Sequence, residues 1–303
     1  TNYLFYDGTQ LTITIEVEPQ LRISIVGIIG GSGLDDPASQ ILKNRSETSQ
    51  ENAKNEFGLP SSNLYQGQIG GTEVVLISRH GVGHKINPTN VNYRANIEAF
   101  RLAGCTHILA STACGSLRES FHRGDLVVPD SFLDRTTKRV GTFFDGTSKL
   151  RYLIGVCHVP MEPAFDPNVR KVILKAAELL DIEIKDGGTV VTIEGPRFSS
   201  KAESRAFQQL GGDLINMTVC PEVCLAKEAG ILYGAIALAT DYDCWKDTGD
   251  RVCVADVMAV FKKNVAKVTQ LLIQSVKLLG TPSDQQMWDE KIDELKVRPF
   301  NHF

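Results

Sequence analysis

The sequence ILYGAIALATDYDCW, residues 231–245, holds the pattern that decides the fold. Its apolar part, 231–240, is too short to cross a membrane as a helix and is typical of a strand buried on both faces. Asp241 and Asp243 follow at once. If the strand continues through them, both carboxylates point the same way, because side chains two residues apart share a face. The alternative is a turn after the strand, with one aspartate capping the next helix.

Six further apolar segments have the length of strands, at residues 23–29, 73–78, 107–112, 125–129, 189–193 and 213–216. Helical patterns lie between and after them, at residues 88–104, 167–180, 199–212 and 254–279. Thr89 is the expected N-cap of the first of these helices. Buried strands that alternate with helices predict an α/β fold, with a mixed, largely parallel central sheet flanked by helices. We expect a single domain over 22–280, an N-terminal extension over 1–21 and a C-terminal tail over 281–303.

The composition is that of an ordinary globular protein, with 42% hydrophobic and 22% charged residues among 303. The formal net charge of −4 argues against binding to nucleic acid or to an anionic membrane. Neither a secretory signal nor a membrane span is visible. The seven cysteines are an odd number and lie mostly in apolar segments, which is typical of free thiols in a reducing compartment. The expected location is therefore the cytoplasm.

Ligands of open α/β sheets bind beyond the carboxyl ends of the strands, so the residues that follow each strand carry the functional signal. The first strand is followed by GGSGLDDP, 30–37, where Ser32 among glycines could hold an anion. This loop matches neither the dinucleotide pattern nor a P-loop. SRHGVGHK, 78–85, supplies Arg79 and His80, which could bind phosphate, and His84. Taken singly, these segments could equally be a plain glycine turn and a surface ion pair.

Three more strand ends carry small, hydroxyl or aromatic residues. Thr112 and Ala113 follow the third strand, Phe198 and Ser199 lie at a strand-to-helix junction, and Met217 and Thr218 precede a helix that starts near Pro221. Hydroxyl groups beside Arg79 indicate a bound phosphate, and an aromatic ring beside two carboxylates indicates a flat heterocycle rich in nitrogen. Phosphate and heterocycle together suggest phosphorolysis or nucleotide binding.

Eight motifs in this order resemble the purine nucleoside phosphorylase superfamily, over about residues 22–280. They are GIIGGSGLDDP (27–37), RHGVGH (79–84), VNYRANI (91–97), TACGSLRE (112–119), FLDRTT (132–137), TIEGPRFSS (192–200), INMTVCPEVCLAKEAGI (215–231) and ATDYDCW (239–245). The resemblance implies a homotrimer, inorganic phosphate as co-substrate, and neither a metal nor an organic cofactor. It also adds the nucleus to the cytoplasm as an expected location.

Two positions indicate which purine is bound. Relatives that cleave 6-oxopurine nucleosides have asparagine in place of Asp241 and glutamate in place of Ser199. The residues of this chain instead suit adenine, because Asp243 can accept from its 6-amino group and a protonated Asp241 can donate to N7. Burial and mutual repulsion of the two carboxylates would raise one pKa and keep that proton available. The implied reaction converts 5′-methylthioadenosine and phosphate into adenine and 5-methylthioribose 1-phosphate.

The resemblance assigns the remaining roles by position. The implied phosphate ligands are Ser32, Arg79, His80, Thr112, Ala113 and Thr218. The base would contact Phe198, Ser199, Asp241 and Asp243, with Asp241 as the catalytic residue, and Met217 would contact the ribose. The 5′-methylthio group would lie near His84, Val252, Val254 and Val257, together with His158 of the partner subunit. The alternatives are a broader 6-aminopurine nucleoside phosphorylase that also cleaves adenosine, and a non-catalytic nucleoside-binding protein.

Overall fold

The apolar segment at 231–240 forms β13 (Leu232–Asp241), and the central sheet is built around it. The computed structural model describes residues 3–6, 11–14, 23–31, 41–146, 155–246 and 253–295. Parallel strands follow β13 on one side, in the order β7 (His107–Ser116), β3 (Ile25–Gly30) and β6 (Thr72–Ser78). Every residue of β13 is buried, as its apolar sequence predicts. Because β8 and β7 flank β13, its carboxyl end lies near the middle of one edge of the sheet.

The rest of the sheet mixes strand directions. Antiparallel β5 (Leu64–Ile69) and β4 (Lys43–Thr48) extend it beyond β6, and β8 (Leu126–Val128) with β10 (Lys185–Asp186) extends it beyond β13. A branch starts at the end of β7, where β12 (Leu214–Asn216) pairs with β11 (Thr189–Ile193), and β11 with β9 (Ser131–Arg135). Six of the ten strand pairings in this sheet are parallel. The predicted fold class is confirmed.

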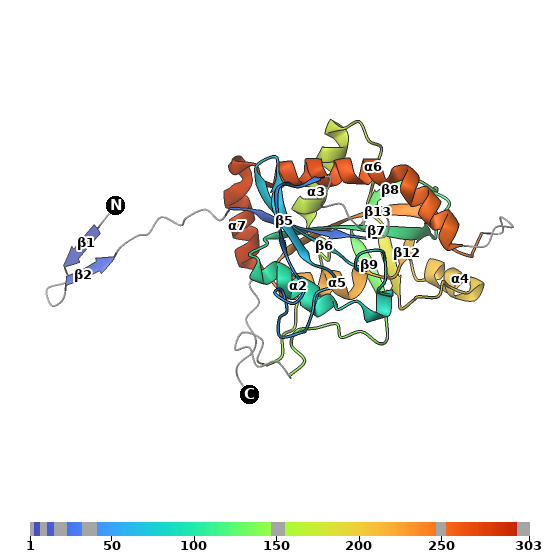
Figure 1. The fold of residues 1–303 in the computed structure, drawn as a ribbon, viewed down its shortest axis with the longest axis horizontal. Helices are drawn as coiled ribbons and strands as arrows, with labels where there is room; N and C mark the ends of the chain where they lie inside the picture. The colour runs from blue at the N-terminus through green and yellow to red at the C-terminus, as the bar shows by residue number, and fades with distance from the viewer. Residues whose placement is uncertain are drawn as a thin grey trace.

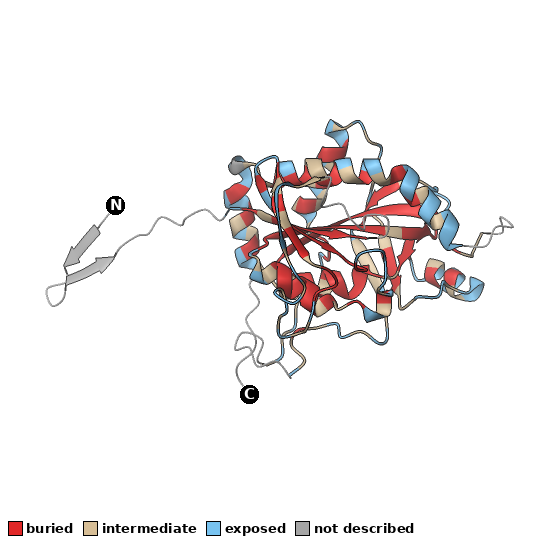
Figure 2. Cartoon of the chain, in the orientation of Figure 1, coloured by how far each residue is buried: buried red, intermediate tan, exposed pale blue. Residues whose placement is uncertain are grey.

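Helices cover both faces of the sheet (Figure 1). On one face lie α2 (Tyr93–Leu102) and α5 (Val219–Glu228). On the other lie α3 (Pro167–Leu179), α6 (Val254–Leu279) and α7 (Gln285–Glu294). Phe100 of α2 and Phe261 of α6 are fully buried, in the cores of opposite faces. Figure 2 shows the result, a buried sheet under helices whose outer stripes are exposed.

The structure divides the helix predicted at 88–104. A 3₁₀ turn, η1 (Pro88–Asn90), comes first, and α2 then starts at Tyr93. The predicted cap is wrong, because Asn92 accepts from the Ala95 N–H at 3.2 Å, whereas the Thr89 hydroxyl donates to the Glu194 carbonyl at 3.3 Å. This turn places Pro88 in the wall of a cavity of about 530 Å³.

The first part of the predicted tail packs on the sheet. After η3 (Pro282–Asp284), α7 places Trp288 in the core with its ring edge-on to His107, at 4.7 Å between ring centroids. From the same helix, Gln285 accepts a hydrogen bond from the Ser24 hydroxyl at 3.1 Å. Of the N-terminal extension, the structure describes β1 (Tyr3–Tyr6) and β2 (Leu11–Thr14), which pair antiparallel. No helix in the described ranges has the length and apolarity needed to cross a bilayer.

Candidate active site

A cavity of about 530 Å³ lies at the strand ends that the sequence singled out. Residues after β6, in the second half of β7 and at the ends of β11, β12 and β13 form its floor, and the first turns of α6 form one wall. The predicted residues that line it are Arg79, His80, His84, Thr112, Ala113, Phe198, Met217, Thr218, Asp241, Asp243, Val254 and Val257. Residues far apart in the sequence thus meet in one place.

Two predicted residues within the described ranges, Ser199 and His158, do not line this cavity. Ser199 is half-buried, and its carbonyl accepts from the Cys244 thiol at 3.1 Å. His158 is exposed and does not line the cavity of its own chain. Ser32 and Val252 lie outside the described residues.

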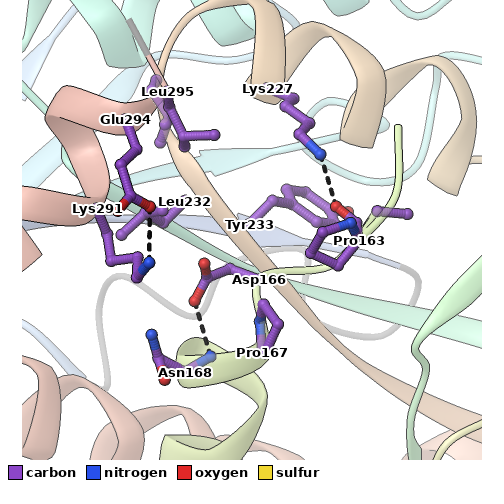
Figure 3. Close-up of a pocket in the computed structure, with 12 residues that line it drawn as sticks. Pro163, Asp166, Pro167, Asn168, Lys227, Leu232, Tyr233, Lys291, Glu294 and Leu295 are labelled. Carbon is purple, nitrogen blue, oxygen red and sulfur yellow. Dashed lines mark hydrogen bonds and ion pairs between the residues drawn. The ribbon is translucent and has the colours of Figure 1, made fainter. Parts of the chain in front are cut away.

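A second cavity, of about 410 Å³, lies between the start of α3 and the ends of α5 and α7 (Figure 3). Its polar groups already bond to one another. Lys227 Nζ donates to the Pro163 carbonyl at 2.6 Å, Lys291 Nζ pairs with Glu294 at 2.6 Å, and Asp166 accepts from the Asn168 N–H at 2.9 Å. It contains none of the predicted residues. The larger cavity is therefore the candidate active site.

Asp241 and Asp243 meet through a turn and not through a shared strand face. Of the two alternatives that the sequence left open, the structure shows the turn, because β13 ends at Asp241 and Asp243 has a φ of 46°. The Asp243 N–H donates to Asp241 Oδ1 at 2.8 Å, which is the closure of an Asx turn. The Thr240 hydroxyl donates to Asp241 Oδ2 at 2.8 Å. Both aspartates stay in the cavity wall, only 6% and 7% exposed.

Burial raises the pKa of both carboxyl groups. For Asp241, the donors Thr240 and Asp243 N–H oppose this rise, whereas the charge of Asp243 adds to it. For Asp243, burial is again the largest cause, and the nearby Ser204 and Ser199 hydroxyls oppose it. Neither serine reaches hydrogen-bond geometry, so Asp243 Oδ2 is buried without a hydrogen-bond partner among the described residues. A carboxylate oxygen in that state suits a ligand that brings a donor.

The opposite end of the cavity is built to hold an anion. Arg79 is 1% exposed and pairs with both carboxylate oxygens of Glu222, at 2.7 and 2.9 Å. Its Nη1 also donates to the Ser111 carbonyl at 3.0 Å. Burial disfavours the charge of Arg79, but Glu222 outweighs this and raises its pKa, so the guanidinium stays charged. Described residues take three of its five N–H groups, which leaves two for an anion.

The sequence analysis did not single out Glu222, which supports Arg79 in the candidate site. It lies in the first turn of α5, is fully buried, and also accepts from the Tyr233 hydroxyl at 2.7 Å. The available signal was an acidic residue among apolar neighbours just after Pro221. Glu222 holds Arg79 from behind and fixes the direction of its remaining donors.

Asn216 was missed as well. Its Nδ2 donates to Thr112 Oγ1 at 3.0 Å, and its Oδ1 accepts from the Thr192 hydroxyl at 3.0 Å. The Thr112 hydroxyl hydrogen must therefore point away from Asn216, toward the neighbouring Thr218 hydroxyl at 3.5 Å, the Ala113 carbonyl or a ligand. Asn216 thus sets the direction in which Thr112 donates.

His80 completes the anion end. Its Nδ1 lies 2.9 Å from the Ile86 carbonyl, which only accepts, so Nδ1 carries a proton and donates it to this bond. The ring stacks on His84, with 4.2 Å between centroids. Among the described residues, no three His, Cys, Asp or Glu side chains cluster closely enough to hold a metal ion. The cavity can thus hold an anion at one end and a hydrogen-bonding ring at the other.

Comparison with known proteins identifies the family. A family model described as the phosphorylase superfamily matches residues 25–277. The S-methyl-5′-thioadenosine phosphorylase of Aedes aegypti is 58% identical over 271 residues, which cover 89% of this chain and 93% of that relative.

Two solved structures from Schistosoma mansoni are 40% identical and each covers 90% of this chain and 96% of the other. One is methylthioadenosine phosphorylase in complex with adenine, with a TM-score of 0.82. The other is a variant of adenosine/methylthioadenosine phosphorylase in complex with methylthioadenosine, with a TM-score of 0.81. The chain therefore belongs to the phosphorylase superfamily and, within it, to the family of S-methyl-5′-thioadenosine phosphorylases.

Proposed function

We propose that this protein catalyses the phosphorolysis of 5′-methylthioadenosine to adenine and 5-methylthioribose 1-phosphate, in purine and methionine salvage. The supporting observation is one cavity that joins an anion end, built on Arg79, to two buried carboxylates, Asp241 and Asp243. The names of the relatives support the same substrate.

In the proposed reaction Asp241 is the proton donor. The C1′–N9 bond breaks, and its electron pair leaves with the base, while the Asp241 carboxyl group gives its proton to N7. Asp243 Oδ2 accepts a hydrogen bond from the 6-amino group. A phosphate oxygen then forms the new bond to C1′, and its negative charge stabilises the cationic ribose as the bond breaks. Asp241 remains as a carboxylate and regains its proton from solvent.

The other residues bind and orient the substrates. Phosphate would contact Ser32, Arg79, His80, Thr112, Ala113 and Thr218. Phe198 would lie beside the base, and the backbone N–H of Met217 would meet a ribose hydroxyl. Ser199 does not line the cavity and would act on the base only through the nearby Asp243 carboxyl group. His84, Val252, Val254 and Val257 would surround the 5′-methylthio group. His158 of the partner subunit would complete this pocket in a homotrimer, and its exposure on one subunit is compatible with that role.

The proposed reaction needs neither a metal nor an organic cofactor, because phosphate itself is the nucleophile and Asp241 supplies the proton. We place the protein in the cytoplasm, with the nucleus as a second compartment. All seven cysteines are free, which supports a reducing environment.

A substrate panel tests this function. Base release is measured from 5′-methylthioadenosine, adenosine and inosine, each with and without phosphate. The proposal expects phosphate-dependent adenine release, fastest from methylthioadenosine and slowest from inosine. Equal or faster cleavage of adenosine would favour the second candidate, a broader 6-aminopurine nucleoside phosphorylase, which the name of the Schistosoma relative supports. Tight binding of adenine without any base release would favour a non-catalytic nucleoside-binding protein.

The rate should depend on pH through both aspartates. Burial raises the pKa of Asp241, so kcat should fall as the pH rises through that raised value and the proton is lost. Asp243 must be ionised to accept from the amino group, so kcat/KM should also fall as the pH drops through its raised pKa. A pH profile that shows both limbs supports the assignment, and an alkaline limb that persists in Asp241→Asn contradicts it.

Gly115→Ala should lower kcat without unfolding the protein. A Cβ at this position would lie 2.9 Å from Asp241 Oδ1 and 3.0 Å from Ile215 Cγ2, so the carboxyl group must move. Small displacements of catalytic groups lower rates by up to about 10²-fold. Gly141→Ala is the matched control, because the nearest atom to a Cβ at this position would be Pro221 Cβ, at 3.9 Å. Steady-state kinetics and thermal melts of both variants measure the difference. Equal kcat values would show that the position of the Asp241 carboxyl group does not depend on a glycine at 115.

A further inference from the structure

Arg139 does not line the cavity, yet it contacts the backbone of two of the cavity's walls. We propose that Arg139 is a positioning residue that holds the nucleoside end of the site in its binding shape. This inference rests on the proposed function and adds a residue to it. Its side chain is only 2% exposed, although it lies in the loop after β9. A buried guanidinium needs partners for its donors, and here those partners lie in the site.

The Nη1 atom reaches the ribose side. It lies 2.6 Å from the Met217 carbonyl and 2.8 Å from the Cys220 carbonyl, and 3.0 Å from the Tyr93 hydroxyl oxygen. The Met217 carbonyl and the Thr218 N–H belong to the same peptide group. Asn216 Oδ1 accepts from that N–H at 3.4 Å. The peptide that joins Met217 to Thr218 is therefore held from both sides.

The Nη2 and Nε atoms reach the base side. Nη2 donates to the Glu194 carbonyl at 2.6 Å, and Nε pairs with Glu194 Oε1 at 3.0 Å. Glu194 starts the loop that leads through Pro196 to Phe198, both of which line the cavity. The two walls also touch, because a Cβ on Gly195 would lie 2.5 Å from Met217 Sδ. One guanidinium thus fixes the base wall against the ribose wall.

Glu194 is itself held in place. Its Oε2 accepts from the Thr137 N–H at 2.6 Å and from the Lys138 N–H at 2.9 Å. Burial would raise the pKa of this carboxyl group, but these bonds and Arg139 lower it to about 2, so Glu194 is ionised at neutral pH. Tyr93 extends the network to a third wall, because its hydroxyl donates to the carbonyl of Pro88, which lines the cavity, at 2.9 Å.

The decisive variant is Arg139→Lys, which keeps the charge but cannot bond in the several directions of a planar guanidinium. Arg170→Lys is the matched control, because Arg170 is also mostly buried and paired with an aspartate, Asp186, but sits on α3 away from the cavity. For both variants, kcat, the KM for methylthioadenosine and the KM for phosphate are measured, with thermal melts. We expect Arg139→Lys to raise the nucleoside KM about tenfold or more. The phosphate KM should rise by a smaller factor, because only one proposed phosphate ligand, Thr218, belongs to a peptide that Arg139 holds. Arg170→Lys should change neither. A lower melting temperature with both KM values unchanged would reduce Arg139 to a structural role and overturn the inference.

Tyr93→Phe gives an independent test if Arg139→Lys fails to fold. It removes one acceptor of Arg139 and the bond to Pro88, while the ring still packs. It should also raise the nucleoside KM, by a smaller factor, and an unchanged value would count against the network.

Calorimetric titration with adenine separates the inference about Arg139 from the proposed function. If the wild type shows no phosphorolysis, the proposed function fails, and Arg139 is then judged by whether its variants bind adenine more weakly than the wild type does.

Discussion

Asp241→Asn should lower kcat for 5′-methylthioadenosine by about 10²–10⁴-fold, the usual contribution of a general acid. The Asx turn and the Thr240 contact place this carboxyl group in the cavity wall, and burial raises its pKa. Asparagine keeps the size of the side chain but has no proton to transfer to N7. The KM for phosphate should change little, because Asp241 and Arg79, the proposed phosphate ligand, belong to opposite ends of the cavity. Steady-state kinetics with each substrate varied in turn measures both effects.

A substrate with an acidic leaving group provides the control. If 4-nitrophenol replaces adenine on 5-methylthioribose, departure needs no proton, and the variant should cleave it at nearly the rate of the wild type. A variant that loses both activities equally would point to a collapsed site and not to a missing acid. Near-full activity of the variant on methylthioadenosine would contradict the role of Asp241 as a proton donor.

The same substitution should alter the pH dependence of stability. A carboxyl group whose pKa is higher in the folded than in the unfolded chain binds its proton more tightly in the fold. Asp241 therefore stabilises the fold below its unfolded pKa of about 3.9, and that contribution is lost as the pH rises through the raised folded pKa. Asparagine does not titrate, so urea unfolding of Asp241→Asn should vary less with pH across this window. An unchanged dependence would mean that Asp241 titrates alike in both states.

Glu222→Gln should lower the free energy of unfolding by about 3–5 kcal/mol, because it leaves the Arg79 charge buried without its partner. It should also raise the KM for phosphate, since glutamine has one oxygen in place of two and cannot accept both guanidinium hydrogen bonds that orient Arg79. Urea unfolding and kinetics with varied phosphate measure the two effects. Glu203→Gln is the control, because its pair with Arg197 is exposed and glutamine can keep the capping bond to the Ser200 N–H, so the loss should stay below about 1 kcal/mol.

The double variant Arg79→Met, Glu222→Leu separates stability from function. It removes both buried charges and replaces them with apolar groups, so it should regain most of the lost stability. It should still fail to use phosphate, because no guanidinium remains. A Glu222→Gln variant as stable as the wild type would show that the pair is not what keeps the Arg79 charge in the core.

The long, strongly patterned elements could be predicted from the sequence. The apolar run of β13 and the stripe of α6 carry their own signal, and α3 begins at Pro167 as its sequence indicates. The edge strand β4 could not be predicted, because its residues KNRSET are polar and almost all exposed. The cap of α2 was ambiguous for a different reason. Thr89 and Asn92 are both capping residues, and the turn at Pro88 decides between them.

The residues of the candidate site were found in part, because strand ends of one sheet must meet at one edge. Their supports were not found. Arg79 and Glu222 are 143 positions apart, and Arg139 and Met217 are 78 apart. No local pattern reports such pairs, since each depends on the folded arrangement of several elements. The sequence left a continued strand and a turn open at Asp241–Asp243, because a positive φ at an aspartate leaves no trace in hydrophobic periodicity.

Transfer of isotopically labelled phosphate tests the central claim most directly. The protein is incubated with 5′-methylthioadenosine and ³²P-phosphate, and adenine and labelled sugar phosphate are quantified together. Phosphorolysis predicts one labelled 5-methylthioribose 1-phosphate for each adenine released, and no adenine when phosphate is omitted. Adenine released without incorporation of label would mean that water is the nucleophile, and the role given to the Arg79 end of the cavity would then be wrong.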